Sequence, residues 1–296
     1  MRILVVGAGG IGGLIAADLA LAGEHEVSLA VRSSVSALVL EEAGERRTAP
    51  VAIIGDPERA GPADLIVVAT KTYDVAGVGP WLAAALTTST DVVVAQNGIE
   101  HVERMAPFVD AARVVPAIVK HAVERHGPGW IERTNRGDIK VPATPGGHRF
   151  ADATSGTSLA VSVVDDFETA LWVKLAYNLA GNSVSTITDL RVRELAVRAP
   201  LREVIHGLVA ECITVAAGRG VVLPADLATV ILDEFAGYPD SIHSSMWQDL
   251  RSGRPFEHDA ISGAVVRAAK AQGERAPFSE MATLLLDAIS PTRQQG

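Results

Sequence analysis

The chain has 296 residues, 48% of them hydrophobic and 21% charged, which is enough for two domains with a sizeable buried core. Its net charge of −9 argues against nucleic acid or an anionic membrane as a partner. The single cysteine, Cys212, excludes an intrachain disulfide and a zinc site built from several thiolates. We therefore expect a cytoplasmic protein that binds no metal, nucleic acid or membrane.

The first half of the chain alternates strands with helices. Arg2–Val6 is an apolar run typical of a buried parallel strand, Gly13–Ala22 predicts a helix that ends at Gly23, and Glu26–Val31 predicts the next strand. Further strands are predicted at Val51–Ile54, Leu65–Ala69, Val92–Ala95 and Val114–Val119, and helices at Val75–Leu86 and His101–Phe108. This alternation indicates an α/β, Rossmann-type, doubly wound sheet.

The region Pro128–Pro145 has a different pattern. Trp130–Arg133 and Asp138–Val141 predict two short strands around the turn Asn135-Arg136-Gly137, a hairpin that would extend the sheet. Turn-forming residues dominate Thr144–Gly147 and Thr154–Ser158, so we expect surface loops there.

The last part of the chain reads as all-α. Helices are predicted at Asp166–Asn182, Leu201–Ala217, Asp226–Phe235, Ser244–Arg251, Glu257–Ala271 and Ser279–Ala288, followed by a frayed tail at Ser290–Gly296. We expect a nucleotide-binding domain over residues 1–164 and a helical substrate domain over residues 165–296.

A glycine-rich turn directly follows the first strand. Gly7, Gly9 and Gly12 form GxGxxG, with Gly10 and Ile11 between them, at the start of a β-α-β unit. In this motif the glycines allow a tight turn, a close approach of the backbone to pyrophosphate, and close helix–strand packing. The phosphates then bind at the helix N-terminus. A purely structural glycine turn is the weaker alternative.

The residues after three strands bear on the choice of cofactor. The second strand ends at Arg32 without the acidic residue that accepts hydrogen bonds from the NAD ribose, and an arginine suits the 2′-phosphate of NADPH. The alternative is a loop arginine that contacts nothing. Lys71 and Asn97 follow later strands, where ligands of open α/β sheets bind, although Asn97-Gly98 can also be a simple turn.

The predicted helix Asp166–Asn182 carries Lys174, Asn178 and Asn182 at i, i+4 and i+8. On an α-helix this spacing puts an ammonium group and two carboxamides on one face. Taken alone, a solvated lysine and two surface amides are the simpler interpretation. Glu257, at the start of a later helix, is either a residue favoured by the helix dipole or a carboxylate that positions Lys174.

Six motifs together resemble the ketopantoate reductase family over nearly the whole chain. They are GAGGIG at Gly7, KTYD at Lys71, QNG at Gln96, WVKLAYNLAGN at Trp172, SMWQD at Ser245 and FEHD at Phe256. The resemblance implies an NADPH-dependent reductase that converts 2-dehydropantoate (ketopantoate) to (R)-pantoate for pantothenate biosynthesis.

The resemblance also implies roles for single residues. Lys174 corresponds to the general acid, and Glu257 to the carboxylate that orients the lysine and the substrate. Asn178, Asn182 and Ser245 correspond to substrate-binding residues, and Asn97 to a residue of the active cleft. No His–Asp pair stands at a motif position, so we expect His121, His243 and His258 to be structural or surface residues.

Departures from the family pattern leave the substrate open. The segment Lys120–His126 is more charged than expected, Ser262 stands where asparagine is usual, and Ser183 replaces a small or apolar residue. A reductase of another small 2-oxo acid is therefore the main alternative, and a non-enzymatic NADP-binding sensor a weaker one. The sequence does not fix the oligomeric state, although helix Glu257–Ala271 offers a surface for a homodimer.

Overall fold

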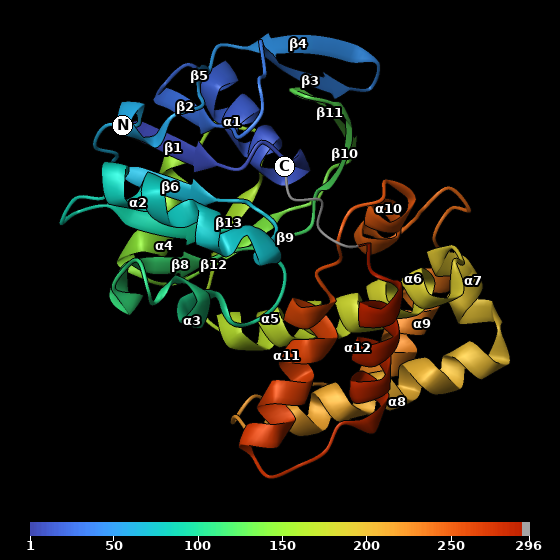
Figure 1. The fold of residues 1–296 in the computed structure, drawn as a ribbon. Helices are drawn as coiled ribbons and strands as arrows, with labels where there is room; N and C mark the ends of the chain where they lie inside the picture. Colours follow the sequence, from blue (N-terminus) through green and yellow to red (C-terminus); the bar gives the residue numbers. More distant parts are fainter. Residues whose placement is uncertain (292–296) are drawn as a thin grey trace. The chain divides into compact units, whose positions relative to one another are not determined.

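The computed structural model describes residues 1–291 and divides into two compact units (Figure 1). The first unit comprises Met1–Gln96 and Glu100–Phe167. The second comprises Asn97–Ile99 and the chain from Glu168 onwards. The short segment Asn97–Ile99 thus belongs to the second unit, although the residues on either side of it belong to the first.

A six-stranded sheet forms the centre of the first unit, with the order β5-β2-β1-β6-β7-β8. All of its neighbouring strands are parallel. The strands are β1 (Arg2–Val6), β2 (Glu26–Ala30), β5 (Ala52–Ile54), β6 (Leu65–Val68), β7 (Asp91–Val94) and β8 (Val114–Pro116). This order confirms the predicted Rossmann-type sheet.

Apolar residues cover both faces of this sheet, because successive side chains of a strand point to opposite sides. In β1, Ile3 and Val5 pack into one buried cluster, whereas Leu4 and Val6 pack into another. The first cluster includes α1 (Gly10–Ala22) and α4 (Pro145–Ala153), and the second includes α2 (Gly79–Ala85) and α3 (His101–Met105). Helices on both faces explain why the strands are continuous apolar runs.

Two predicted helices of this unit begin or end differently from expectation. The helix α1 begins at Gly10, three residues before the predicted Gly13, and ends as predicted at Gly23, whose φ is +76°. The segment predicted as one helix, Val75–Leu86, starts as a 3₁₀ helix, η2 (Thr72–Val78), and continues as α2. Pro80 stands in the first turn of α2, where a missing N–H costs nothing. Shorter 3₁₀ turns are η1 (Pro57–Arg59) and η3 (Ala111–Arg113).

The predicted hairpin in Pro128–Pro145 is wrong. The strand β11 (Trp130–Asn135) pairs with β10 (Ala122–Gly127) across the turn Pro128-Gly129, where Gly129 has φ +74°. Proline followed by a glycine of positive φ is typical of a type II turn, and we placed the turn later instead. A four-stranded sheet of order β10-β11-β3-β4 results, with β3 (Leu38–Glu42) and β4 (Glu45–Ala49).

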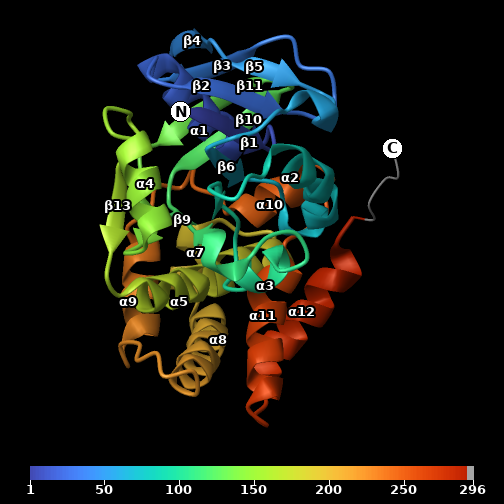
Figure 2. The same cartoon turned by 90° about the vertical axis from the view of Figure 1, so that its left-hand side faces the viewer.

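The other half of the predicted hairpin joins a third sheet. The strand β12 (Ile139–Pro142) lies between β9 (Ile118–Val119) and β13 (Val161–Val164). Figure 2 shows β13 beside α4. The predicted strand Val114–Val119 is correspondingly divided into β8 and β9, and the predicted loop at Thr144–Gly147 is the start of α4.

Buried ion pairs explain why β11 lies beside β3. The Arg133 side chain is fully buried and donates to Glu42 at 2.7 Å and to Asp18 of α1 at 2.9 Å. Hydrogen bonds from Arg133 and Arg136 lower the pKa of Glu42 to about 2. This network fastens α1 to the second sheet through charges far apart in the sequence.

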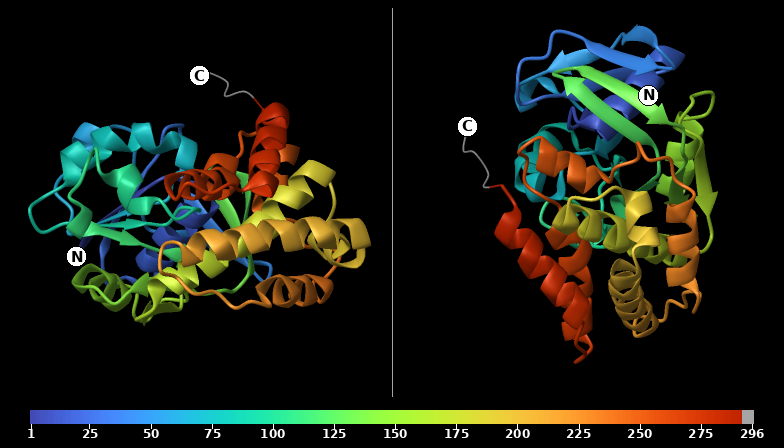
Figure 3. Two further views of the ribbon diagram at one scale, coloured as in Figure 1. Left: turned by 90° about the horizontal axis from the view of Figure 1, so that it is seen from below. Right: turned by 90° about the vertical axis from the view of Figure 1, so that its right-hand side faces the viewer.

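The second unit is helical, which confirms the predicted all-α domain. After the opening helix α5 (Phe167–Asn178), its helices are α6 (Val184–Thr188), α7 (Val192–Val197), α8 (Ala199–Ala217), α9 (Leu227–Ala236), α10 (Ser245–Arg251), α11 (His258–Ala271) and α12 (Pro277–Ile289). Figure 3 shows α11 and α12 running side by side. No helix within residues 1–291 has both the length and the apolarity needed to cross a bilayer.

The helix predicted at Asp166–Asn182 is α-helical only to Asn178. A π-helical segment, Leu179–Ser183, follows and leads into α6. The prediction of one continuous α-helix is therefore wrong, and it is the π segment, Leu179–Ser183, whose residues are all buried in the core of the unit. The π segment also changes the directions of the side chains after Asn178.

Candidate active site

The glycine turn of the first unit is shaped by close backbone contacts. Gly7 has φ +115°, and a Cβ there would stand 2.8 Å from backbone atoms of Ala69 and Thr70 at the end of β6. A Cβ at Gly12 would collide with the carbonyl oxygen of Gly7. Both positions therefore require glycine, one for the turn and one for helix–strand packing.

The N-terminus of α1 is suited to an anionic ligand. Its N-cap is Gly9, no side chain within the described chain caps the helix, and its first turn carries no acid. A Cβ added at Gly9 would meet nothing within 4 Å, whereas one at Gly10 would meet the Val123 side chain of β10. The exposed N–H groups and the open space beside Gly9 fit the pyrophosphate of a dinucleotide.

Arg32 contacts an acidic residue, so the interpretation of a loop arginine that touches nothing is wrong. Its Nη2 donates to Oδ2 of Asp74 at 2.8 Å. The Arg32 side chain is 71% exposed and that of Asp74 only 9%. Asp74 lies in η2, which begins after Lys71 and follows β6. The sequence placed Asp74 in the KTYD motif but did not indicate this pairing.

Gln96 and His101 fix the exit of β7, a feature that we did not predict. The Gln96 side chain donates to the carbonyl oxygen of Thr70 at 2.8 Å and thereby ties the ends of β7 and β6 together. The ring of His101 donates to the carbonyl oxygen of Gln96 at 2.9 Å. Burial lowers the pKa of His101 to about 4, so this ring is neutral at physiological pH. Gly98, with φ +98°, completes the turn.

In the second unit, Asn97 joins two of the predicted site residues. Its Nδ2 donates to Oε2 of Glu257 at 3.1 Å, and its Oδ1 accepts from Nδ2 of Asn178, also at 3.1 Å. Glu257 is the N-cap residue of α11, is 5% exposed and makes no capping bond with its own helix. Its carboxylate therefore has a role beyond favouring the helix dipole.

Asn182 and Ser245 form a second contact. Oδ1 of Asn182 accepts from Oγ of Ser245 and from the backbone N–H of Met246, both at 3.3 Å. Ser244 caps α10 by accepting from the N–H of Trp247, and its hydroxyl lies 2.6 Å from that of Ser185. These bonds hold the N-terminus of α10 against the π segment.

Lys174 lies on α5 one turn before Asn178 and is partly buried. In an α-helix four residues exceed one turn, so a row of i, i+4 and i+8 drifts around the axis. The wider turn of the π segment rotates less per residue and returns Asn182 toward the row of Lys174 and Asn178. Because Asn178 and Asn182 are 7% and 5% exposed, the interpretation of two surface amides is wrong.

The three histidines expected to be structural or surface residues have contacts within the fold. His121 donates to the carbonyl oxygen of Leu159 at 2.8 Å and accepts from the N–H of Gly137 at 3.1 Å. His243 stacks on Trp247 with 3.6 Å between ring centroids. Burial lowers the pKa of His258, which stands 3.6 Å from Asp287.

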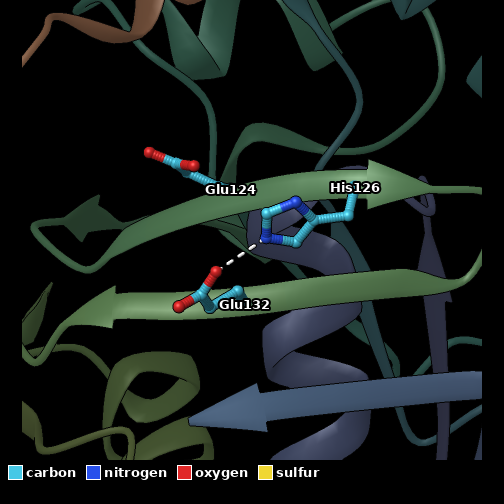
Figure 4. Close-up of side chains that lie close together, drawn as sticks. All are labelled: Glu124, His126 and Glu132. Atoms are coloured by element: carbon cyan, nitrogen blue, oxygen red, sulfur yellow. Dashed lines mark hydrogen bonds and ion pairs between the residues drawn. The ribbon is translucent and has the colours of Figure 1, made fainter. Parts of the chain in front are cut away.

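One group of possible metal ligands lies on the second sheet of the first unit. Glu124 and His126 of β10 and Glu132 of β11 have ligand atoms within 4.8 Å of one another (Figure 4). Glu132 accepts a hydrogen bond from His126 at 2.7 Å, and Glu124 and His126 are exposed. Exposed acidic and histidine side chains of this kind are common on protein surfaces without a bound ion.

A glycine-rich turn at a helix N-terminus and a lysine followed on its helix by two hydrogen-bonded amides are typical of a nicotinamide-dependent oxidoreductase. The family model "Ketopantoate reductase PanE/ApbA" matches residues 3–146, and its C-terminal counterpart matches residues 166–290. The chain belongs to the ketopantoate reductase family, whose members act on a CH–OH group.

Individual relatives agree with this assignment. The chain is 36% identical over 292 residues to a 2-dehydropantoate 2-reductase of Caulobacter vibrioides, covering 97% of this chain and 99% of the relative. It is 32% identical to the enzyme of that name from Mycobacterium tuberculosis, with 97% of each chain covered.

Solved structures share the fold. A ketopantoate reductase of Ralstonia eutropha has a TM-score of 0.89 at 30% identity, with 98% of each chain covered. Two more have 22% identity and 98% coverage of each chain: a dimeric ketopantoate reductase of Staphylococcus aureus, with a TM-score of 0.87, and a D-mandelate dehydrogenase bound to NADH, with 0.89.

Proposed function

We propose that this chain reduces 2-dehydropantoate to (R)-pantoate with NADPH, as a step of pantothenate biosynthesis. The observation that carries the proposal is the hydrogen-bonded series Asn178–Asn97–Glu257, one helical turn from Lys174, in a member of the ketopantoate reductase family. Residues 1–164 would bind the cofactor and residues 165–296 the substrate. A cytoplasmic location, expected from the sequence, remains a prediction.

The cofactor would bind at the glycine turn of the first unit. The uncapped N-terminus of α1 and the open space at Gly9 support a pyrophosphate there, with Gly7, Gly10, Ile11 and Gly12 forming the turn. Arg32 supports a 2′-phosphate, and Lys71 and Asn97 stand at the carboxyl ends of β6 and β7. When bound, NADPH supplies the hydride for the carbonyl carbon.

Lys174 would donate the proton that the reduced carbonyl oxygen needs. Its positive charge stabilises the negative charge that develops on that oxygen in the transition state. Glu257 would hold the lysine in place, and Asn97 would orient Glu257 through the 3.1 Å bond described above. Lys174, Glu257 and Asn97 would thus act as one unit.

The hydrogen bonds of the two predicted substrate amides leave different groups for a ligand. Asn178 uses one N–H of its Nδ2 for Asn97, which leaves its carbonyl oxygen to accept from a substrate hydroxyl and its second N–H to donate. Asn182 uses its Oδ1 for Ser245 and Met246, which leaves its Nδ2 as the donor. A hydroxylated 2-oxo acid such as ketopantoate has both a donor and acceptors for this pair.

A substrate screen that follows the absorbance of NADPH tests this proposal. We expect ketopantoate to give the highest kcat/KM among small 2-oxo acids. If ketopantoate is inert and another 2-oxo acid turns over, the main alternative is correct, and the charged segment Lys120–His126, which follows β9 and forms most of β10, becomes the region to examine. If no carbonyl compound consumes NADPH, the sensor interpretation is correct.

We also propose that the protein is a homodimer that pairs through α12 rather than through the expected helix Glu257–Ala271. Most residues of α11 are buried within the second unit. In contrast, α12 carries a stripe of exposed apolar side chains next to its buried residues. The exposed side chains are Phe278, Met281, Leu284, Leu285 and Ile289, between 44% and 70% exposed. A stripe of this kind is typical of an interface.

Charge favours a second copy of this chain as the partner. Arg275 precedes α12 and lies 3.3 Å from Glu280, and Asp287 lies near the end of α12, 3.6 Å from His258. The side chains of Arg275 and Asp287 are nevertheless 80% and 78% exposed. An antiparallel pair of α12 helices puts Arg275 of each copy near Asp287 of the other, around the apolar stripe. Light scattering should give a dimer for the parent and a monomer for Leu284→Glu, with Asp233→Asn as a matched surface control. A monomeric parent contradicts the proposal.

A further inference from the structure

The ion pair between Arg32 and Asp74 lies at the glycine turn. The strand order β2-β1-β6 puts the ends of β2 and β6 on either side of the end of β1. The N–H of Gly7 donates to the carbonyl oxygen of Ala30 at 3.4 Å, and its Cα faces the backbone of Ala69 and Thr70. Arg32 follows β2 and Asp74 follows β6, and Nη2 of Arg32 lies 2.8 Å from Oδ2 of Asp74, so this pair joins the segments that follow the two neighbours of β1.

The pair combines two groups that usually serve different cofactors. An acidic residue near the end of the second strand accepts from the ribose hydroxyls of NAD, and an arginine there accommodates the 2′-phosphate of NADP. Here β2 supplies only the arginine, and the carboxylate comes from η2, after a different strand. A search of the second strand alone therefore detects only the NADP-type residue.

We propose that Asp74 limits the preference of this enzyme for NADPH and allows NADH to bind. This inference rests on the proposed function, because it assumes that the ribose binds beside Arg32. A 2′-phosphate carries about two negative charges at neutral pH and must approach a guanidinium group that already has a carboxylate at 2.8 Å. The same carboxylate can accept a hydrogen bond from an unmodified ribose.

Asp74 has a second effect, because it orders an otherwise exposed arginine. The Arg32 side chain is 71% exposed, and a fixed guanidinium group loses less conformational freedom when it binds phosphate. The ordering acts on one side chain, whereas the repulsion acts between the buried carboxylate and about two phosphate charges. Repulsion therefore outweighs ordering, and removing the charge of Asp74 should favour NADPH.

Fragments of the cofactor isolate this effect from catalysis. We would measure the binding of 2′,5′-ADP, 5′-AMP, NADPH and NADH to the full chain by calorimetry. In Asp74→Asn, which keeps the size of the side chain, affinity for 2′,5′-ADP should rise at least about tenfold. Affinity for 5′-AMP and NADH should stay equal or fall. Asp233→Asn, an exposed acid of α9, controls for the change in net charge.

A second background separates repulsion from ordering. In Arg32→Ala, the affinity for NADPH should fall to about the affinity for NADH, since the 2′-phosphate loses its charged partner. Adding Asp74→Asn to Arg32→Ala should still raise affinity for 2′,5′-ADP. If Asp74 acts only by ordering Arg32, this second step changes nothing and the inference is wrong. Asp74→Ser serves as a second variant should Asp74→Asn not fold.

The outcomes also distinguish this inference from the proposed function. If the parent binds both dinucleotides and Asp74→Asn leaves their affinity ratio within twofold, or weakens 2′,5′-ADP, the inference is overturned and the proposed function stands. If the parent binds neither dinucleotide, both are overturned.

Discussion

Replacing Asn97 by alanine tests whether the hydrogen-bonded series of the second unit acts in catalysis. The change removes two bonds of 3.1 Å, one between amides and one to the Glu257 carboxylate. A neutral hydrogen bond is worth about 0.5–1.5 kcal/mol and one to a charged group about 1.5–3 kcal/mol, so their sum is about 2–4.5 kcal/mol. If both bonds contribute fully to stabilisation of the transition state, kcat/KM falls by about 30- to 2,000-fold.

The assay is steady-state reduction of ketopantoate, with NADPH binding measured separately because Asn97 is also a predicted cofactor residue. Asn135→Ala is the matched control, since Asn135 is exposed at the end of β11. Asn97→Ala combined with Glu257→Gln should be non-additive by about 1.5–3 kcal/mol, because each single change already removes the bond to the carboxylate.

The isosteric variant Asn97→Asp gives a stricter test. It replaces the Nδ2 donor by a second carboxylate oxygen at 3.1 Å from Glu257. Two carboxylates this close raise the pKa of one of them, so turnover at neutral pH should fall below that of Asn97→Ala and recover partly at lower pH. Activity of Asn97→Ala within threefold of the parent, or purely additive double variants, would refute the reasoning.

Three further changes address the proton donor, the buried ion pairs and a buried histidine. Lys174→Ala should lower kcat by about 10²–10⁴ and leave calorimetric NADPH binding nearly unchanged; a loss below about threefold would sink its role as general acid. Arg133→Ala should lower the free energy of unfolding in urea by about 3–5 kcal/mol, because Asp18 stays buried at 5% exposure without this cation. The control Arg136→Ala removes an arginine whose side chain is 64% exposed and should lower the free energy of unfolding far less than Arg133→Ala does. Burial lowers the pKa of His101 from 6.5 to about 4, so the unfolded chain binds a proton in this window that the folded chain does not. The contribution of this histidine to the free energy of unfolding is therefore fully present above pH 6.5 and is lost as the pH falls to about 4. His101→Gln should flatten the pH dependence of urea unfolding between these values, and an unchanged pH dependence contradicts the assignment.

Local sequence patterns were sufficient to predict the parallel strands, the end of α1 and the glycine turn. Apolar runs bounded by turns identified the strands of the parallel sheet, and Gly23 ended α1 where its positive φ was expected. The GxGxxG turn was readable from the spacing of its glycines directly after a strand, and Gly7 and Gly12 stand where a Cβ would collide with backbone atoms. The order of six motifs indicated the family, since chance rarely preserves both spacing and sequence over a whole chain.

Strand pairing in Pro128–Pro145 was not readable, because pairing depends on contacts between distant residues. Two turn signals compete in this region, Pro128-Gly129 and Asn135-Arg136-Gly137, and only the first is a hairpin. The choice follows from Arg133, whose buried bonds reach Asp18 and Glu42, 115 and 91 residues away. No local pattern records such a partner.

The candidate site divides in the same way. The sequence by itself determined which residues we predict to carry the chemistry, because Lys174, Asn178, Asn182 and Glu257 stand at readable motif positions. Only the tertiary structure decided that Asn97 bridges Asn178 and Glu257, since that bridge joins three separate segments. It also decided that Asp74 meets Arg32, because only the strand order brings the ends of β2 and β6 to the two sides of β1.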